Sequence, residues 1–231
     1  MTGPFCVWQD IYTIGSAEIS HPLDCCIYLI DAGELVLIDA GAGKSFDYLT
    51  NNILALGLDP NKLDSVIVTH AHIDHIGALA YFKREYGIKI IAHELDAHAI
   101  ESGKGIGAEF YGVDYQPCPI DTKLQGAECD LRLGKYEFKI LHIPGHTPGS
   151  IAIYLNVAGK RLLFGQDIHG PYEVAWGSNL DQAITSLQKL TDIKADILCE
   201  GHFGIYQPAE EVRGYIENYL YQLQHMTTGK H

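Results

Sequence analysis

One stretch of this sequence restricts the possible folds more than any other. Residues 69–75 read Thr-His-Ala-His-Ile-Asp-His and directly follow residues 65–68, a short β-branched run typical of a buried strand. Residues 76–86 have a helical pattern, and Gly87 is suited to end that helix. Three imidazoles and a carboxylate therefore stand at a strand-to-helix turn, where layered α/β proteins tend to place their ligand sites.

The side chains of this turn have the chemistry of metal ligands. Neutral imidazole and carboxylate suit Zn, Fe or Mn. His70 and His72 are separated by one residue, so in an extended chain they point the same way and can bind one ion. Asp74 and His75 stand at the helix start and can turn toward a second position. A polar turn without metal is the alternative, and further ligands elsewhere in the chain would argue against it.

Length and composition limit the class of protein. With 231 residues, 47% of them hydrophobic, the chain can bury a sizeable core, and we expect one domain over residues 1–231. A net charge of −13 disfavours nucleic acid as a partner. No apolar run approaches the ~18 residues of a membrane span, and no signal peptide is evident. The six cysteines form no CxxC pair, so we expect reduced thiols in a cytoplasmic protein.

The remaining pattern predicts an α/β protein. Each half of the chain runs through strands and then a helix, which favours two stacked sheets with helices outside, a four-layer αββα sandwich. The predicted strands cover residues 7–14, 25–30, 34–39, 65–68, 89–92, 129–133, 136–143, 150–155, 161–164 and 193–199. The predicted helices cover 45–56, 76–86, 94–102, 181–190 and a last helix that begins at Pro208.

Residues 103–125 show no period and contain several aromatic side chains. A segment of this length in a compact domain is usually functional. We expect a lid over a pocket or a contact in a possible homodimer, with a plain connecting loop as the alternative.

Three further polar residues follow predicted strands: His146, Asp167 and His202. Five histidines and two aspartates are too many for one tetrahedral ion and suit two. We expect one ion at His70, His72 and His146, a second at Asp74, His75 and His202, and Asp167 between them. Asp39 also ends a strand, and we expect it to accept a proton from a ligand imidazole. Two cations would lower the pKa of a shared water, so that a bridging hydroxide could act as nucleophile.

As a set, these motifs resemble those of the metallo-β-lactamase-fold superfamily. The resemblance covers Asp39-Ala-Gly41, residues 69–75, Pro-Gly-His-Thr-Pro-Gly-Ser at 144–150, Asp167 and Gly201-His202. It implies the αββα fold. An aspartate at 167 argues against true β-lactamases, and His72 argues against flavodiiron proteins. The ligand set is similar to that of glyoxalase II, acyl-homoserine lactonases and tRNA 3′-processing nucleases, of which charge disfavours the nucleases.

The resemblance implies a metal-dependent hydrolase that is glyoxalase II-like and acts on a thioester, ester or lactone of a small acyl substrate. Its cofactors would be two divalent ions, zinc before iron or manganese. Asp74 would orient the hydroxide, and Tyr172, the counterpart of a lactonase tyrosine, would steady the oxyanion. The short segment after His202 argues against the helical extension with which glyoxalase II binds glutathione.

Three alternatives remain open at this point. One is a persulfide dioxygenase with a single iron at His70, His146 and Asp167. Another is an acyl-homoserine-lactone-type lactonase, and a third is a metal-binding module without turnover. His169 could line the pocket or lie in a solvated loop.

Overall fold

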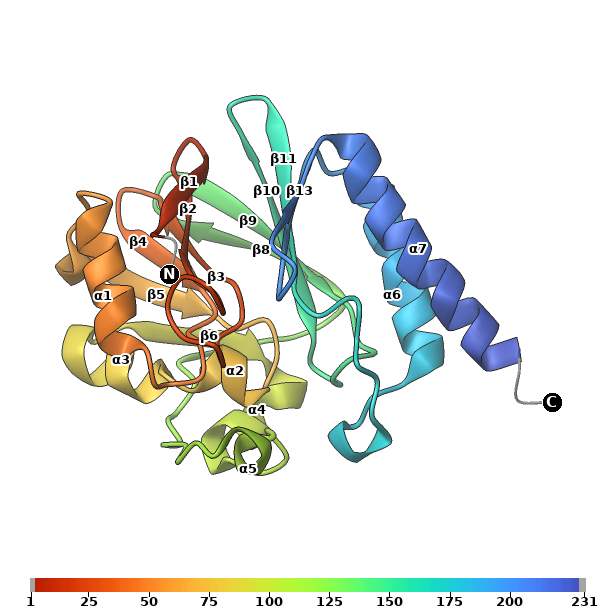
Figure 1. Ribbon diagram of the computed structural model, residues 1–231, viewed down its shortest axis with the longest axis horizontal. Helices are drawn as coiled ribbons and strands as arrows, with labels where there is room; N and C mark the ends of the chain where they lie inside the picture. Colours follow the sequence, from red (N-terminus) through yellow and green to blue (C-terminus); the bar gives the residue numbers. More distant parts are fainter. Residues whose placement is uncertain (1–2, 229–231) are drawn as a thin grey trace.

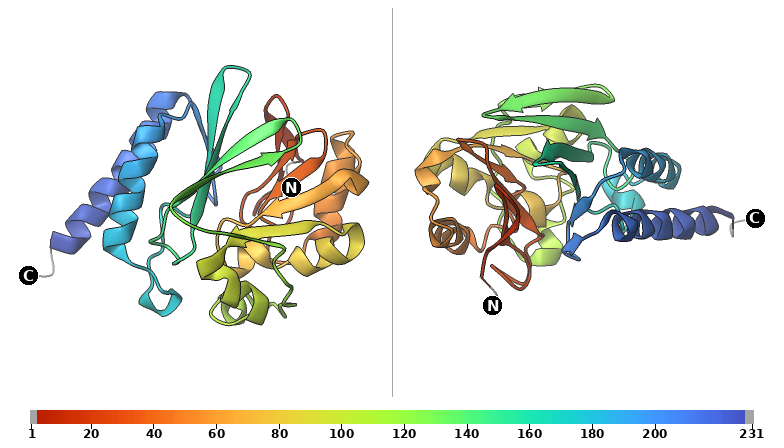
Figure 2. Two further views of the ribbon diagram at one scale, coloured as in Figure 1. Left: turned by 180° about the vertical axis from the view of Figure 1, so that it is seen from behind. Right: turned by 90° about the horizontal axis from the view of Figure 1, so that it is seen from above.

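The computed structural model describes residues 3–228 and contains two β-sheets packed face to face, with helices on both outer faces (Figure 1). The predicted αββα sandwich is confirmed. Figure 2 shows the two helical layers on opposite sides of the paired sheets. Among the described residues, no helix is both long and apolar enough to cross a membrane.

The first sheet has seven strands that follow one another in chain order. Its strands β1 to β4 are antiparallel, whereas β4 to β7 are parallel. The carboxyl ends of β4 and β5 therefore lie at one edge of the sheet. The strands are β1 (Phe5–Trp8), β2 (Ile11–Gly15), β3 (Ile27–Asp31), β4 (Leu35–Ile38), β5 (Leu63–Ile67), β6 (Lys89–His93) and β7 (Thr122–Leu124).

The second sheet has six strands in the order β13-β12-β11-β10-β9-β8. Its one parallel pair is β11 with β12, so the residues that follow these two strands share an edge. The strands are β8 (Glu128–Leu133), β9 (Tyr136–His142), β10 (Ile151–Val157), β11 (Lys160–Gly165), β12 (Ile197–Glu200) and β13 (Ile205–Tyr206).

Helices α1, α3 and α4 pack against the first sheet, α2 follows the end of β5, α5 lies below α4 in the view, and α6 and α7 lie on the second sheet (Figure 1). Their bounds are α1 (Phe46–Ala55), α2 (Ile73–Ile76), α3 (Leu79–Tyr86), α4 (Glu94–Ser102), α5 (Ala108–Tyr111), α6 (Leu180–Ile193) and α7 (Ala209–Thr228). Short 3-10 turns are η1 (Pro60–Lys62) and η2 (Val174–Trp176).

The apolar core between the sheets joins the two halves of the chain. The Tyr28 ring packs edge-on against Phe164, with ring centroids 5.3 Å apart. The Tyr28 hydroxyl donates a hydrogen bond of 2.7 Å to the carbonyl of Glu200, at the end of β12. Both rings are fully buried. This contact fixes the end of β12, and so the turn that carries His202, against the first sheet.

Four predicted boundaries differ from the structure. The strand predicted over 7–14 is a hairpin, β1 and β2, because Gln9 takes a positive φ of 50° and reverses the chain. The helix predicted over 76–86 is interrupted between α2 and α3. A Cβ on Gly77 would lie 2.2 Å from the carbonyl carbon of Ala42, so only glycine allows this close approach.

The other two differences arise from tertiary contacts that hydrophobic periodicity in the sequence does not reveal. Helix α6 continues to Ile193, so β12 begins later than predicted, at Ile197. Residues 103–125, predicted to be irregular, contain α5 and β7. Strand β7 exists because Thr122 and its neighbours pair in parallel with β6.

Candidate metal centre

The seven side chains predicted as ligands all lie together, at the edge where β5, β11 and β12 end. They form two groups whose potential ligand atoms lie within 4.8 Å of one another. The groups are His70, His72, His146 and Asp167 in one, and Asp74, His75 and His202 in the other. Only His202 is partly exposed.

In the first group, three imidazole nitrogens converge. His70 Nε2 lies 3.2 Å from His72 Nδ1, and His146 Nε2 lies 2.9 Å from the same atom. Asp167 Oδ2 lies 3.7 Å from His70 Nε2 and 3.4 Å from His146 Nε2. Four ligand atoms from three separate turns therefore surround one point.

The second group meets the other oxygen of the same aspartate. Asp167 Oδ1 lies 3.2 Å from His202 Nε2 and 3.5 Å from His75 Nε2. Asp74 Oδ2 lies 3.3 Å from His202 Nε2 and 3.6 Å from His75 Nε2. The two carboxylate oxygens of Asp167 thus face different groups, which is the geometry expected of a shared ligand.

Hydrogen bonds at the backs of the rings show that this donor set fits cations. His146 Nδ1–H donates to the Pro171 carbonyl at 2.7 Å, and His75 Nδ1–H donates to Asp39 Oδ2 at 2.8 Å. In the neutral rings the Nε2 lone pairs then point into the centre. His75 Nε2 and Asp167 Oδ1 are buried without a hydrogen-bond partner. Such buried acceptors are costly unless a cation or proton meets them.

The pKa shifts of the first group agree with cation binding. Burial and the neighbouring His75 and His146 hold the pKa of His70 well below its ordinary value. Burial and His146 lower the pKa of His72 to about 3. Burial opposes ionisation of Asp167, but His75, His146 and His202 outweigh it and hold its pKa well below the usual range. Neutral imidazoles and an ionised carboxylate are the forms that ligate metal.

In the second group, burial raises the pKa of Asp74. Burial opposes protonation of His202, but the nearby Asp167 carboxylate outweighs it and raises the pKa of this ring. Burial also opposes protonation of His75, but Cys25 and the surrounding carboxylates outweigh it and raise its pKa, so without a cation this ring favours its protonated form.

Asp39 supports the second group from behind, as the sequence predicted. Its Oδ2 accepts hydrogen bonds from His75 Nδ1 at 2.8 Å and from Thr69 Oγ1 at 2.7 Å, and its Oδ1 accepts from Thr69 N at 2.8 Å. The hydrogen bond expected between Asp39 and an imidazole of the cluster is present, and that His75 ligates a metal stays a prediction. This carboxylate fixes both the orientation and the tautomer of His75.

Asp96 is a support that the sequence reasoning missed. It is buried on α4, and its Oδ2 accepts hydrogen bonds from Ala71 N at 2.9 Å and Thr147 Oγ1 at 2.8 Å. Its Oδ1 accepts from Gly149 N at 2.7 Å. One carboxylate therefore ties the turn of His70 and His72 to the turn of His146. The available signal was an acidic residue beside the apolar positions Ala97 and Ile100 of one helix.

Glu200 has the same role for the last ligand turn. It is fully buried, and its Oε2 accepts hydrogen bonds from the backbone amides of His202 at 2.7 Å and Phe203 at 2.8 Å. Its Oε1 accepts from His169 Nδ1 at 2.7 Å. His169 is thereby held at the wall of the cavity above the centre.

That cavity has a volume of about 260 Å³ and opens over the two ligand groups. Ile106, Gly107 and Tyr111 line it from the 103–125 segment, in agreement with the lid alternative for that segment. Burial and the nearby Asp74 carboxylate raise the pKa of Tyr111, so its phenol keeps its proton.

Tyr172, predicted from the sequence to steady the oxyanion, packs beside the cluster. Its hydroxyl donates a 2.9 Å hydrogen bond to the Ile168 carbonyl, and its ring packs against His146 at 6.2 Å between centroids. It does not line the cavity over the centre, whereas Tyr111 does. The geometry therefore favours Tyr111 over Tyr172 as the phenol that faces a substrate.

Comparison with known proteins agrees with this geometry. A family model described as the metallo-beta-lactamase superfamily matches residues 22–202. The probable metallo-hydrolase YqgX of Bacillus subtilis is 30% identical over 185 residues, which cover 76% of this chain and 82% of the relative. The hydroxyacylglutathione hydrolase GloC of Haemophilus influenzae is 31% identical over 147 residues, which cover 63% of this chain and 66% of the relative.

Solved structures share the fold. The MIM-2 metallo-β-lactamase aligns with a TM-score of 0.82 at 20% identity and covers 99% of this chain and 91% of its own. The class B3 di-zinc metallo-β-lactamase LRA-12 from an Alaskan soil metagenome has a TM-score of 0.79 at 24% identity, with 96% and 92% covered. With this family match, the chain belongs to the metallo-β-lactamase superfamily, a family of metallo-hydrolases, and it has a cluster of His and Asp side chains that could hold metal ions.

Proposed function

We propose that this protein is a dinuclear metallohydrolase that cleaves a thioester, ester or lactone bond of a small acyl substrate. The observation that supports it best is the division of the two Asp167 oxygens between two ligand groups beneath an open cavity. His70, His72 and His146 would hold one cation, and Asp74, His75 and His202 the other. Bound divalent cations would supply a water of lowered pKa and polarise the substrate carbonyl.

The residues of the chain position the reactants. The Asp74 carboxylate lines the cavity and would accept a hydrogen bond from the attacking water, which orients the water toward the carbonyl carbon. The protonated phenol of Tyr111 would donate a hydrogen bond to the oxygen on which negative charge develops. Trp176 and Phe203 also line the cavity and would exclude bulk water from the reacting bond.

Similarity to a hydroxyacylglutathione hydrolase supports hydrolysis at an acyl carbon. The test is to reconstitute the protein with Zn, Fe or Mn, remove unbound metal, and measure both bound metal and turnover of a thioester and lactone panel. We expect two equivalents per chain and turnover with at least one of these metals. The Asp167→Ala variant should bind at least one equivalent of metal fewer than the wild type. Its kcat/KM should fall about a hundredfold or more, because the substitution removes the shared ligand.

The matched control is Asp192→Ala, an exposed aspartate on α6, which should retain both the metal and the activity. Full activity in Asp167→Ala would refute the two-metal proposal. One equivalent of iron, together with oxygen uptake on glutathione persulfide, would instead establish the dioxygenase alternative.

A further inference from the structure

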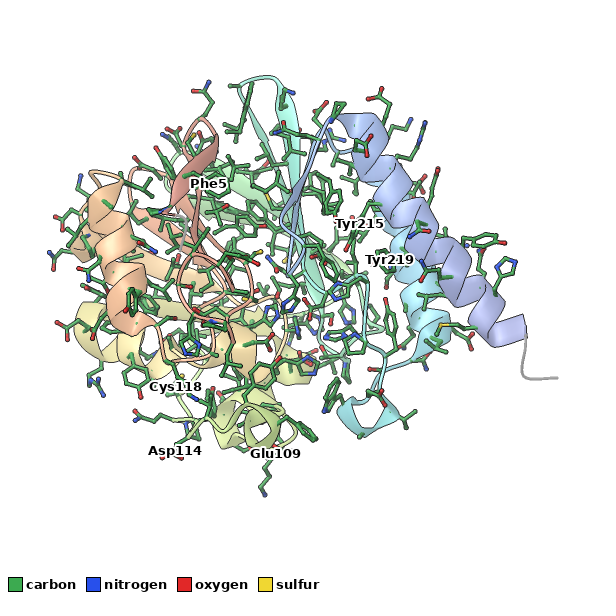
Figure 3. All side chains as sticks on the ribbon, in the orientation of Figure 1. Phe5, Glu109, Asp114, Cys118, Tyr215 and Tyr219 are labelled. Atoms are coloured by element: carbon green, nitrogen blue, oxygen red, sulfur yellow. The ribbon has the colours of Figure 1, made fainter. Side chains whose placement is uncertain are left out.

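Two larger cavities adjoin the one over the metal centre and share wall residues with it. A cavity of about 630 Å³ shares His202 and Phe203 and extends toward β1 and β2. A cavity of about 520 Å³ shares His169 and Pro171 and extends along α7. Figure 3 shows Phe5 and Tyr219, which line these two cavities, on opposite sides of the central region. Each of these two cavities is called an arm of the site below, because each borders the cavity over the proposed reacting centre.

We propose that the substrate is an acyl compound without anionic groups, whose apolar acyl chain lies in the arm along α7 and whose leaving group lies in the arm beside β1 and β2. This proposal rests on the proposed hydrolase function and specifies its substrate class. It predicts that a carrier with several carboxylates or phosphates, such as glutathione or coenzyme A, is a poor leaving group here.

The first reason is the charge of the two arms. Within the described part of the chain, no lysine or arginine lines either arm or the central cavity. Acidic residues line both arms: Glu18 in one and Glu173 in the other. Carboxylates and phosphates are normally bound by Arg or Lys, and here they would meet like charge. The net charge of −13 adds a repulsive field.

The cations of the centre do not change this conclusion for the arms. They would lie among His70, His75 and their neighbours, at the reacting carbonyl. The distal groups of a substrate would lie beyond His169 on one side and beyond Phe203 on the other.

The second reason is the apolar character of the α7 arm and of its entrance. Tyr172, Leu180, Tyr219, Leu223 and Met226 supply most of the wall of the arm. Large apolar side chains stand unusually exposed on the segments around the central cavity: Phe110 is 73% exposed, Val174 87% and Phe203 56%. Exposed apolar groups gathered at a pocket mark a binding surface for apolar ligand parts.

Turnover of matched substrates tests the substrate class. We would compare octanoyl thioesters of N-acetylcysteamine, which is uncharged, and of glutathione on the metal-loaded enzyme. The uncharged thioester should have a kcat/KM about tenfold or more higher. Lengthening the acyl group from acetyl to octanoyl should raise kcat/KM by roughly tenfold or more, because the added CH₂ groups are buried. Equal or faster turnover of the glutathione thioester would overturn the proposal and leave the hydrolase function standing.

A binding measurement separates the two proposals if no thioester is cleaved. Uncleavable octyl thioethers of N-acetylcysteamine and glutathione would be titrated into Trp8→Phe protein, in which Trp176 at the cavity is the remaining tryptophan. Tighter binding of the uncharged thioether supports the substrate class even without turnover. Equal or tighter binding of the glutathione thioether refutes it.

Variants that add or reverse a charge test the two arms separately. Met226→Glu places a charge in the α7 arm and should weaken binding of the octyl N-acetylcysteamine thioether at least fivefold but not that of the methyl analogue. Tyr221→Glu, an exposed position on the same helix outside the arm, is its control. Glu18→Lys should improve binding of the glutathione thioether several-fold, whereas Glu217→Lys on the surface of α7 should not. Equal effects at the arm and control positions would contradict the assignment.

Discussion

Removal of the Asp96 carboxylate should damage the metal centre although Asp96 touches no proposed ligand ring. Asp96→Ala leaves the amides of Ala71 and Gly149 buried without their acceptor. Thr147 Oγ1 keeps its contact with Ser150 Oγ at 2.8 Å. Each orphaned amide costs about 1–3 kcal/mol, and part of this is offset because a buried carboxylate no longer has to be desolvated. We expect a net loss of about 2–4 kcal/mol in unfolding free energy.

The functional loss follows from the two turns that Asp96 joins. Without it, the turn of His70 and His72 and the turn of His146 are no longer held to each other, and supports of this kind are worth about 10- to 100-fold in metal affinity. Asp96→Asn keeps one acceptor oxygen. If that oxygen takes the Oδ2 position, the Gly149 N–H loses its acceptor and faces the NH₂ group of the new side chain, so Asp96→Asn should cost about 1–3 kcal/mol.

The assay combines urea unfolding of the metal-free protein with zinc affinity by competition against a chelator. Asp64→Ala is the control, because it removes a partly exposed aspartate whose ion pair with Lys89 is on the surface. It should change the unfolding free energy by less than about 1 kcal/mol. Wild-type zinc affinity in a folded Asp96→Ala protein would refute the role of Asp96 in joining the two turns.

Three further predictions follow from the site. Tyr111→Phe should lower kcat about 10- to 100-fold with little change in KM, because it removes one hydrogen-bond donor to the oxyanion. In the control variant, Tyr172→Phe, kcat should change by no more than a few-fold. Similar losses of kcat in both variants would count against the role of Tyr111. Gly149→Ala should lower Tm and cost roughly 1–3 kcal/mol, since its Cβ would lie 2.5 Å from Asp96 Cγ; an unchanged Tm would contradict this. Burial raises the pKa of Asp96, so its stabilising contribution is fullest below about pH 4 and is lost as the pH rises through the raised value. Metal-free wild type should therefore lose stability relative to Asp96→Asn as the pH rises above about 4, and a constant difference in urea unfolding would refute this.

Much of the site could be predicted because the proposed ligands stand next to local sequence patterns that indicate strand ends. His70, Asp167 and His202 all stand just after apolar runs that read as strands, and the strands before them are β5, β11 and β12. Strands β11 and β12 are parallel neighbours, so a local pattern was enough to predict that Asp167 and His202 would meet, whereas the packing of the two sheets brings His70, after β5, to the same edge. The interrupted helix at Gly77 and the extra strand β7 were not predictable, because they depend on a neighbouring backbone rather than on their own sequence.

The sequence by itself determined the sandwich fold, the seven candidate ligands and the supporting role of Asp39. Only the tertiary structure decided that the two oxygens of Asp167 face different groups, that Asp96 joins two turns, and that Tyr111 rather than Tyr172 faces the cavity. Strands and strand ends can be recognised in the sequence from hydrophobic periodicity and turn residues. Contacts between a helix and two distant turns have no period, and only packing in three dimensions fixes them.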